Sequence, residues 1–387
     1  SGKEFESYPF GERPKIDFTD KLYLAPLTTV GNLPFRRICK EYGVDVTCGE
    51  MAMVSNLLKG QASEWALLKR HPSEDCFGVQ VCGGFTDSMT QAAELIDQNV
   101  DADFIDINMG CPIDIVFTKG MGSGLMERTG RMQQIIQGMS SVMKNKALTV
   151  KMRMGVKDGQ FLAHKLIPKA TQWGATAITI HGLTRHQRYT KEADWNYVSQ
   201  CVDATRALDS KPAIIGNGDV LSWEDYVRSK ELSKANTIMI ARGALVKPWI
   251  FTEIKENRHW DISSSERFDM LKRYTTYALE HFGTDSSGVE KSRRFLLEWL
   301  SFLHRYVPVG LMERLPQKIN QRPPAYFGRD ELETLMASDQ SVDWITISER
   351  LLGKAPEGFK FVAKHKSNSY GVSASDRQHA ANAHNYA

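Results

Sequence analysis

The chain of 387 residues carries 49 Lys and Arg against 46 Asp and Glu, with 42% hydrophobic and 25% charged residues. This composition is that of a globular protein and excludes a disordered or fibrous chain; the length suits one large domain and a smaller one. No apolar run reaches about 18 residues, so no membrane span is expected. The net charge of +3 does not by itself indicate a nucleic-acid partner.

The ends of the chain have few features of a folded domain. Residues 1–15 lack the basic, apolar and small-residue zones of a secretory signal, and the first residue is Ser1 and not Met, which suggests a fragment of a longer protein. We expect an N-terminal extension over 1–20 and a polar tail over 354–387.

The six cysteines form no C-x-x-C pair and no cluster with histidines, so no metal site is expected. Reduced thiols favour an intracellular location, in the cytoplasm, the nucleus or both.

Short apolar runs of strand type alternate with helical patterns over residues 21–258. The expected strands are 22–27, 45–51, 77–81, 104–109, 148–152, 177–181, 213–217 and 237–241. The expected helices are 33–42, 87–99, 131–144, 161–173, 195–207 and 222–233, with a kink or a break at Pro168. Eight β/α units predict a TIM (β/α)8 barrel; a doubly wound open sheet is the alternative, although it rarely carries so many regular repeats.

Residues 259–353 predict a small helical domain, because the strand-type runs cease. Its expected helices are 268–281, 291–306, 332–337 and 345–352, the first preceded by a cap at 263–266 and ended by Gly283. A local basic excess over 291–329 includes Lys291, Arg293, Arg294, Arg305, Arg314, Lys318, Arg322 and Arg329. Such a run is either a solvated helical face or a surface that contacts phosphates.

If the barrel prediction holds, chemically active residues should follow the strands at their carboxyl ends. The residues in those positions are Thr28, Glu50, Gln80, Asn108, Cys111, Lys151, Arg153, His181, Asn217, Asp219 and Arg242. Each has a plain structural alternative: Cys111 as a small buried hydrophobe, His181 as a hydrogen-bonded core histidine, Gln80 as a backbone partner. Lys151 is harder to explain in this way, because an unpaired ammonium within an apolar strand is costly and requires an anionic neighbour or ligand.

Glycine-rich turns follow the seventh and eighth expected strands, at 215–219 and 241–244. TIM barrels often bind a phosphate there, and Arg242 adds charged donors. Neither a Rossmann fingerprint nor a Walker loop is present. Flavin mononucleotide fits these groups: its phosphate would lie on the two turns, and Lys151 would face the anionic edge of the reduced ring.

The segment 106–112, with the sequence DINMGCP, resembles the active-site motif of the tRNA-dihydrouridine synthases. Further motifs in the family's order are APLT at 25–28, VQV at 79–81, TVKMR at 149–153, IHG at 180–182, ADW at 193–195, GNGD at 216–219 and IARG at 240–243. The resemblance runs from about residue 13 to 370. The segments 294–300 and 314–316 resemble the eukaryotic zinc-finger-bearing subtype, whose N-terminal fingers are absent from this sequence.

The resemblance implies roles for individual residues. It implies Cys111 as the proton donor and FMN bound by Pro26, Leu27, Thr28, Gln80, Lys151, His181, Asn217, Gly218, Asp219, Ala241 and Arg242. We expect substrate contacts from Asn108, Arg153, Arg185, Lys291, Arg293 and Arg294, with Arg188 in the same loop as Arg185. Arg153 has a second interpretation, as a residue that orients Asn108.

The resemblance further implies NADPH as reductant and a uridine of the tRNA variable loop as substrate, with uridines of some messenger RNAs also attributed to the family. Hydride would pass from the flavin to C6 of the base and a proton from Cys111 to C5. A base in folded RNA must first be turned out of its stack. We expect a monomer and no membrane contact. The alternatives are an FMN barrel reductase of a free pyrimidine and a non-catalytic RNA-binding module.

Overall fold

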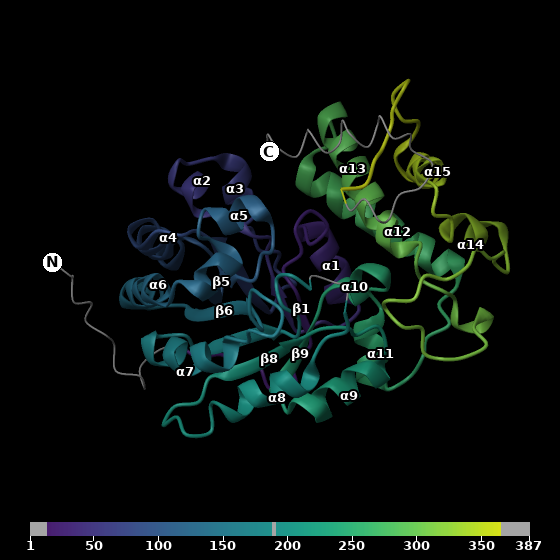
Figure 1. Cartoon of the computed structure of the whole chain (residues 1–387). Helices are drawn as coiled ribbons and strands as arrows, with labels where there is room; N and C mark the ends of the chain where they lie inside the picture. Colours follow the sequence, from purple (N-terminus) through teal and green to yellow (C-terminus); the bar gives the residue numbers. More distant parts are fainter. Residues whose placement is uncertain (1–13, 188–190, 365–387) are drawn as a thin grey trace. The chain divides into compact units, whose positions relative to one another are not determined.

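Nine parallel strands form one sheet in the computed structural model, which describes residues 14–187 and 191–364 (Figure 1). They are β1 (Tyr23–Leu24), β2 (Val46–Cys48), β3 (Ala52–Met53), β4 (Cys76–Cys82), β5 (Phe104–Met109), β6 (Ala147–Arg153), β7 (Ala177–His181), β8 (Ala213–Asn217) and β9 (Thr237–Ile240). Because β1 pairs with β2 and β9, and β2 also pairs with β4, eight strands close into a ring, with β3 beside β4 outside it. The predicted TIM barrel is confirmed, and the open sheet is excluded.

Contacts divide the described chain into two units. The first holds the described residues up to Asn32, then Val44–Val220 and Asp225–Ala241; the second holds Leu33–Gly43, Leu221–Glu224 and the described residues from Arg242 onward. The first unit is the barrel. The second unit includes the segment between β1 and β2.

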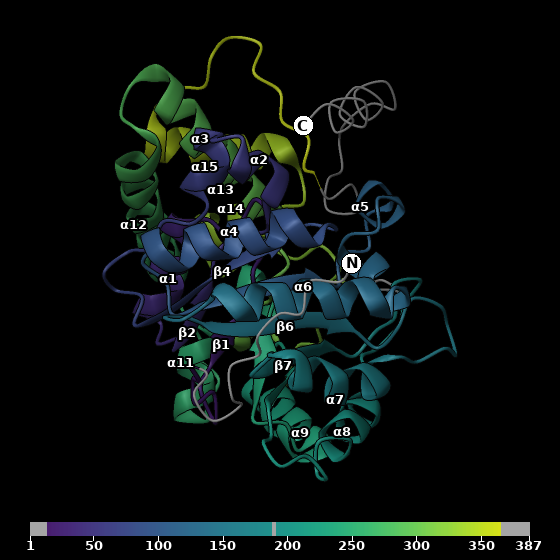
Figure 2. The same cartoon turned by 90° about the vertical axis from the view of Figure 1, so that its left-hand side faces the viewer.

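Within the barrel unit, the helices that follow the strands lie on the outside of the barrel (Figure 2). The barrel unit holds α2 (Val54–Leu58), α3 (Ala62–Ala66), α4 (Thr86–Asn99), α5 (Asp114–Thr118), the 3-10 turn η2 (Gly122–Glu127), α6 (Thr129–Val142), α7 (Ala163–Trp173), α8 (Trp195–Asp203) and most of α9 (Trp223–Ser233). Helices α4 and α6 bury the apolar faces that their spacing predicts, so the sequence period sets which side meets the sheet.

Helix α7 runs through Pro168 without a break, so the break that the sequence allowed is absent. Proline removes one N–H donor and crowds the preceding turn. The buried side chains Leu166, Ile167 and Ala170 lie on both sides of it along one face, and their burial offsets the lost hydrogen bond.

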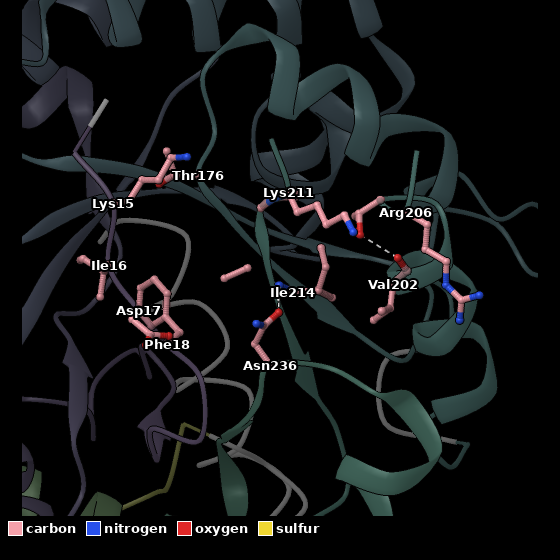
Figure 3. Close-up of a pocket in the computed structure, with 13 residues that line it drawn as sticks. Lys15, Ile16, Asp17, Phe18, Thr176, Val202, Arg206, Lys211, Ile214 and Asn236 are labelled. Carbon is pink, nitrogen blue, oxygen red and sulfur yellow. Dashed lines mark hydrogen bonds between the residues drawn. The ribbon is translucent and has the colours of Figure 1, made fainter. Parts of the chain in front are cut away.

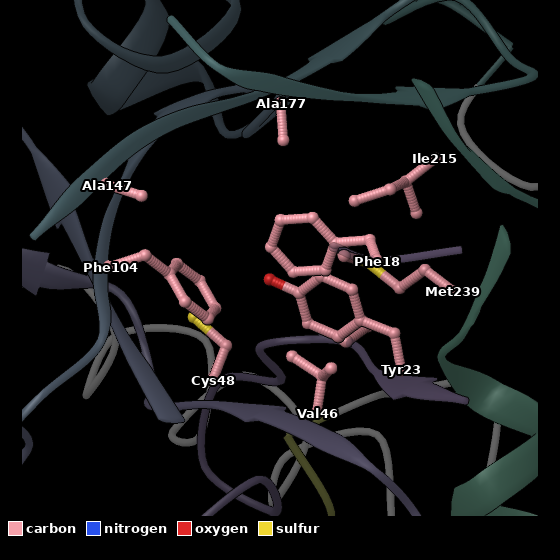
Figure 4. Close-up of a cluster of buried hydrophobic side chains, with 10 residues drawn as sticks. Phe18, Tyr23, Val46, Cys48, Phe104, Ala147, Ala177, Ile215 and Met239 are labelled. Carbon is pink, nitrogen blue, oxygen red and sulfur yellow. The ribbon is translucent and has the colours of Figure 1, made fainter. Parts of the chain in front are cut away.

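The floor of the barrel is apolar (Figure 4). The rings of Phe18 and Tyr23 stack with 5.8 Å between their centroids, and Phe104 meets both edge-on. Phe18 comes from the segment before β1, so the side chain of a residue outside the strands fills the interior of the barrel at this end. Ala147 and Ala177 complete this layer from β6 and β7.

The inward residues become polar toward the carboxyl ends of the strands. Side chains alternate along a strand, so Phe104, Asp106 and Asn108 of β5 share one face. Phe104 pairs in register with Ala147, Asp106 with Thr149 and Asn108 with Lys151. Along the six residues of β5, the inward face is therefore apolar at Phe104, polar at Asp106 and again polar at Asn108, which lies beside the charged Lys151.

A hollow of about 380 Å³ lies near the amino-terminal end of β8 (Figure 3). Lys15, Arg206 and Lys211 stand at its rim, while Phe18 and Ile214 form part of its apolar wall. The hollow lies at the opposite end of the strands from the candidate site residues.

The second unit is helical. It holds α1 (Leu33–Glu41), α10 (Arg242–Val246), α11 (Ile250–Glu256), α12 (Ser264–Phe282), α13 (Ser286–Leu303), the turn η3 (Val309–Leu311), α14 (Glu331–Met336) and α15 (Ser341–Leu352). The expected capping box is present, with Ser263 and Glu266 bonded reciprocally, and Gly283 ends α12. Trp299 is fully buried against Phe35 and Tyr274, and its indole N–H donates to Leu245 O at 3.0 Å.

Charged residues interrupt the two longest described helices, α12 and α13, and none of the described helices could span a bilayer.

The apolar floor of the barrel gives a stability prediction at Gly78. A Cβ atom at Gly78 would lie 2.0 Å from the Phe104 ring, so Gly78→Ala must displace the aromatic layer. We expect it to lower the free energy of unfolding by about 1–3 kcal/mol in denaturant titrations. Gly130→Ala is the control, because nothing lies within 4 Å of a Cβ there and the residue is in α6. That change should stabilise by about 0.5–1 kcal/mol. Equal effects at the two sites would contradict this account of Gly78.

Candidate active site

A buried carboxylate lies beneath the mouth of the barrel. Asp106, only 2% exposed, accepts hydrogen bonds from Gln80 Nε2 at 2.8 Å and from Thr149 Oγ1 at 2.6 Å. The other end of the Gln80 amide accepts from Asn108 Nδ2 at 2.9 Å. Burial raises the pKa of Asp106, and the neighbouring Lys151 charge and the two donors act against that rise. These side chains form one hydrogen-bonded chain across β4, β5 and β6.

The peptide that carries Cys111 is held on both sides. Asn108 Oδ1 accepts from the backbone N–H of Gly110 at 3.2 Å and of Cys111 at 2.9 Å. Arg153 Nε donates to Gly110 O at 2.8 Å, and Ser123 Oγ donates to Cys111 O at 2.8 Å. The backbone of Cys111 is therefore held in place at the carboxyl end of β5.

The Cys111 thiol is a weak acid in this setting. Burial raises its pKa, although the N–H of Ile113 and the charges of Arg153, Lys151 and Arg185 act in the other direction. A thiol with a raised pKa is protonated at neutral pH and can donate a proton.

Lys151 lies opposite Asn108 in the pairing of β5 with β6. Burial lowers the pKa of Lys151 to about 8, and the nearby Arg153 guanidinium acts in the same direction. The Asp106 carboxylate partly offsets both effects. Two cations and one carboxylate leave this part of the rim positive.

Arg153 and Arg185 make bonds within the barrel unit. Arg153 is 3% exposed and also donates through Nη1 to Thr184 O at 3.2 Å, so its guanidinium joins the loops that follow β5 and β7. Arg185 pairs with Asp114 and covers the Phe117 ring with 3.9 Å between Cζ and the centroid. Arg188 lies outside the described residues.

The loop after β1 contains the expected wall of Pro26, Leu27 and Thr28. It is a tight turn, because Gly31 N donates to Leu27 O at 2.8 Å and a Cβ at Gly31 would lie 2.4 Å from that oxygen. Thr29 has φ of 73°, and its N–H donates to Glu50 Oε1 at 2.6 Å. Glu50 thus stabilises an unfavourable backbone conformation beside the expected cofactor wall.

The ends of β7 and β8 bring His181 and Asn217 into register. Asn217 Nδ2 donates to Met239 O at 3.0 Å, and Asp219 Oδ2 accepts from Ala193 N at 2.8 Å. A Cβ at Gly218 would lie 2.6 Å from that of Ala193, so packing within the barrel already requires glycine there.

Ala241 follows β9 at the end of the barrel unit, and Arg242 begins α10 in the second unit.

The expected RNA contacts of the second unit do not share one environment. Lys291 and Arg294 are exposed on α13. Arg293 is 0% exposed and donates to Ser348 Oγ at 2.9 Å and to Gly353 O at 2.9 Å. Its guanidinium ties α13 to the end of α15, so the expected phosphate contact of Arg293 is corrected to an internal structural role.

The structure brings Gln80, Asn108, Cys111, Lys151 and Arg153 together on β4, β5 and β6 and the adjoining loop. Sequence reasoning missed the roles of Asp106 and Glu50. The signal for Asp106 was available, because a carboxylate two residues before Asn108 shares its inward face. No comparable pattern pointed to the partner of Glu50. Among the residues 14–187 and 191–364, no group of three His, Cys, Asp or Glu side chains could hold a metal ion.

Known proteins resemble most of this chain. The family model described as dihydrouridine synthase matches residues 23–303. A Xenopus tropicalis protein named tRNA-dihydrouridine(47) synthase (NAD(P)(+))-like is 61% identical over 93% of this chain and 55% of its own length. The human protein of the same name is 61% identical over 93% of this chain and 54% of its own length.

A Coprinopsis cinerea protein named tRNA-dihydrouridine(47) synthase (NAD(P)(+)) is 51% identical over 96% of this chain and 56% of its own length. The chain thus spans about half the length of these curated relatives. A family match that runs from β1 to the end of α13 covers the barrel and the first long helices of the second unit. The chain belongs to the dihydrouridine synthase family.

Proposed function

We propose that this chain catalyses the FMN-dependent reduction of uridine to 5,6-dihydrouridine in tRNA, with NADPH as reductant. The observation that carries the proposal is the Cys111 peptide, which Asn108 and Arg153 hold on the same rim as Lys151. The names of the relatives support a uridine of the tRNA variable loop as the position. We extend the proposed substrates to uridines in some messenger RNAs.

The residues present fit FMN. Lys151 and Arg153 outnumber the Asp106 carboxylate, so this rim carries an excess of positive charge, which suits the anionic edge of a reduced flavin. Lys151 and Gln80 would hold the ring, and Pro26, Leu27 and Thr28 would form a wall beside it. The proposed phosphate site comprises Asn217, Gly218, Asp219, Ala241 and Arg242 on the two turns, and His181 is a further proposed FMN contact. Bound FMN, once reduced by NADPH, supplies the hydride.

The residues of the chain supply the proton and the orientation. Hydride addition at C6 of uracil places negative charge toward C5, so an acid on the opposite face must protonate C5. Cys111 is that acid, because its thiol is protonated at neutral pH. Asn108 retains one N–H of its amide, which is available to a uracil carbonyl. Arg153 keeps the Cys111 loop in place through Gly110.

The RNA itself would be held by charge. We propose that Arg185, Lys291 and Arg294 contact phosphates while the target base is turned out of its stack. We further propose that the protein acts as a monomer inside the cell, in the cytoplasm, the nucleus or both. The six free cysteines support a reducing compartment.

Cys111→Ala separates the two half-reactions. The variant should retain FMN and oxidise NADPH but lose dihydrouridine formation by about 100-fold or more, because general acid catalysis contributes about 10²–10⁴. Reduced bases would be mapped in unmodified tRNA. Cys76→Ala makes the same chemical change at the start of β4, at the other end of the barrel, and should retain activity.

A wild-type yield from Cys111→Ala would remove the acid role. Turnover of free uracil would favour the reductase of free pyrimidines. Purified protein without flavin that still binds tRNA would favour the non-catalytic module.

Lys151→Met should weaken FMN binding and stabilise the flavin-free protein. The folded-state pKa of Lys151, about 8, lies below the ordinary value of 10.5, so the buried charge costs stability below pH 8. That cost fades as pH rises from 8 to 10.5. We therefore expect a higher thermal midpoint than wild type at pH 7 and a smaller difference near pH 10.

Lys146→Met is the matched control for Lys151→Met. Lys146 Nζ donates to Asp97 O at 2.9 Å, so its loss should lower the thermal midpoint and leave FMN affinity unchanged. Flavin fluorescence titration measures the affinity. Unchanged affinity in Lys151→Met would remove Lys151 from the cofactor site.

Charge reversal at Lys291 and Arg294 together should weaken tRNA binding and reduce its dependence on salt concentration. Each lost phosphate contact lowers the slope of log K against log salt by about one. Lys291→Glu with Arg294→Glu would be compared with Arg206→Glu plus Lys211→Glu, which lie beside the hollow near the amino-terminal end of β8 (Figure 3). Equal losses for the two pairs would indicate an effect of net charge alone.

A further inference from the structure

The hydrogen-bonded chain between Asp106 and Cys111 has a direction. Gln80 Nε2 donates to Asp106 Oδ2 at 2.8 Å, Asn108 Nδ2 donates to Gln80 Oε1 at 2.9 Å, and Cys111 N donates to Asn108 Oδ1 at 2.9 Å. Every donor points from the loop toward the carboxylate. The two amides in the middle are the members that could be reversed.

Both ends of the chain have fixed polarity. A backbone N–H can only donate, so Asn108 must present its oxygen to Gly110 and Cys111 and its NH2 group to Gln80. Gln80 must then present its oxygen to Asn108 and its NH2 group to Asp106. An ionised carboxylate can only accept, so it favours the same orientation from the other end.

We propose that Asp106 and Gln80 are positioning residues for Cys111: an acceptor at position 106 and the N–H groups of Gly110 and Cys111 require the same orientation of both amides, and that orientation holds the peptide that carries the thiol. The inference rests on the proposed function, in which Cys111 is the acid. Asp106 touches neither the thiol nor the peptide that it orients.

Reversal of an amide in this hydrogen-bonded series would be costly, because the series is buried. Asp106 and Gln80 are each 2% exposed, so a reversed amide would leave two buried acceptors or two buried donors facing each other. Thr149 Oγ1 occupies the second oxygen of Asp106 at 2.6 Å. The titratable groups that interact with Asp106 from other strands are Lys151 on β6 and Tyr23 on β1.

Asn108→Asp places a carboxyl on each side of Gln80. The single amide oxygen of Gln80 must then face one of the carboxyls, and that carboxyl must be protonated to donate. Asp106 is the one whose pKa burial already raises, so it takes the proton. The pKa of Asp106 lies above its value in the unfolded state. The hydrogen-bonded series from Asp106 to Cys111 is therefore intact at low pH, and it breaks as the pH rises through the folded-state pKa of Asp106.

Asp106→Asn combined with Asn108→Asp reverses both hydrogen bonds of the Gln80 side chain and loses none. Asn at 106 donates through Nδ2 to Gln80 Oε1 and accepts from Thr149 through Oδ1. Gln80 donates to Asp at 108, which accepts from the backbone N–H groups of Gly110 and Cys111. No proton is required, so the double variant should not depend on pH.

Asp106→Asn alone is the matched control. Its Oδ1 accepts from Gln80 Nε2, and its NH2 group donates to the Thr149 hydroxyl, which can accept. The amides at Gln80 and Asn108 keep their original orientation. This variant should therefore leave the Cys111 loop unchanged at all pH values.

The test measures alkylation of Cys111 by iodoacetamide in the full chain as purified, from pH 5.5 to 9, by mass spectrometry of the peptide that carries it. We expect Asn108→Asp to change the alkylation rate at pH 8 to 9 by about threefold or more relative to wild type at the same pH, because the loop is released. Its thermal midpoint should fall by about 5 °C between pH 5.5 and pH 8 relative to wild type. The double variant and Asp106→Asn should stay within about twofold of the wild-type rate, without that pH-dependent fall.

A double variant no better than Asn108→Asp at pH 8, or an Asn108→Asp defect that is the same at every pH, would overturn the proposal. If Asn108→Asp does not fold, a folded double variant still supports it, and failure of both to fold overturns it. Neither measurement requires uridine reduction. If the double variant regains the wild-type alkylation rate while Cys111→Ala retains full activity, the acid role of Cys111 is rejected and the positioning role of Asp106 and Gln80 is kept.

Discussion

The alternation of side chains along β5 is the constraint on which the rest of the site depends. Phe104, Asp106 and Asn108 face the interior in turn, so one strand contributes to the apolar floor, the buried carboxylate and the rim. A shift of one residue in register would place all three outside, against the helices. The barrel therefore fixes its core and its chemistry with the same backbone pairing.

The gradient from apolar floor to charged rim explains why the polar groups are tolerated. Asp106 and Lys151 are costly where they lie, and each reduces the cost of the other by opposite charge. The side-chain amides of Gln80 and Asn108 connect Asp106 to the Cys111 loop by hydrogen bonds, and Arg153 bonds the same loop through Gly110 O. The hydrogen bonds that orient this rim therefore lie within the protein itself.

The second unit shows how little a local charge pattern says about exposure. Arg293 and Arg294 are neighbours in sequence, yet one is fully buried and bonded to α15 while the other is exposed. The apolar face of α13 was readable from its spacing, with Trp299 at its centre. Which arginine lies at the edge of that face depends on the helix that packs there.

The barrel, the strand ends that carry chemistry and the family can all be read from the residues in order, because strand period and ordered motifs are local properties of the chain. The sequence also indicated that Lys151 requires an anionic neighbour. The folded molecule adds that Asp106 lies beside Lys151 and that Asn108 bonds the Cys111 peptide. It also adds that Arg293 is internal and that α7 continues through Pro168. These are pairings between segments distant in the chain, or balances of burial against local preference, and no residue pattern records which partner lies opposite.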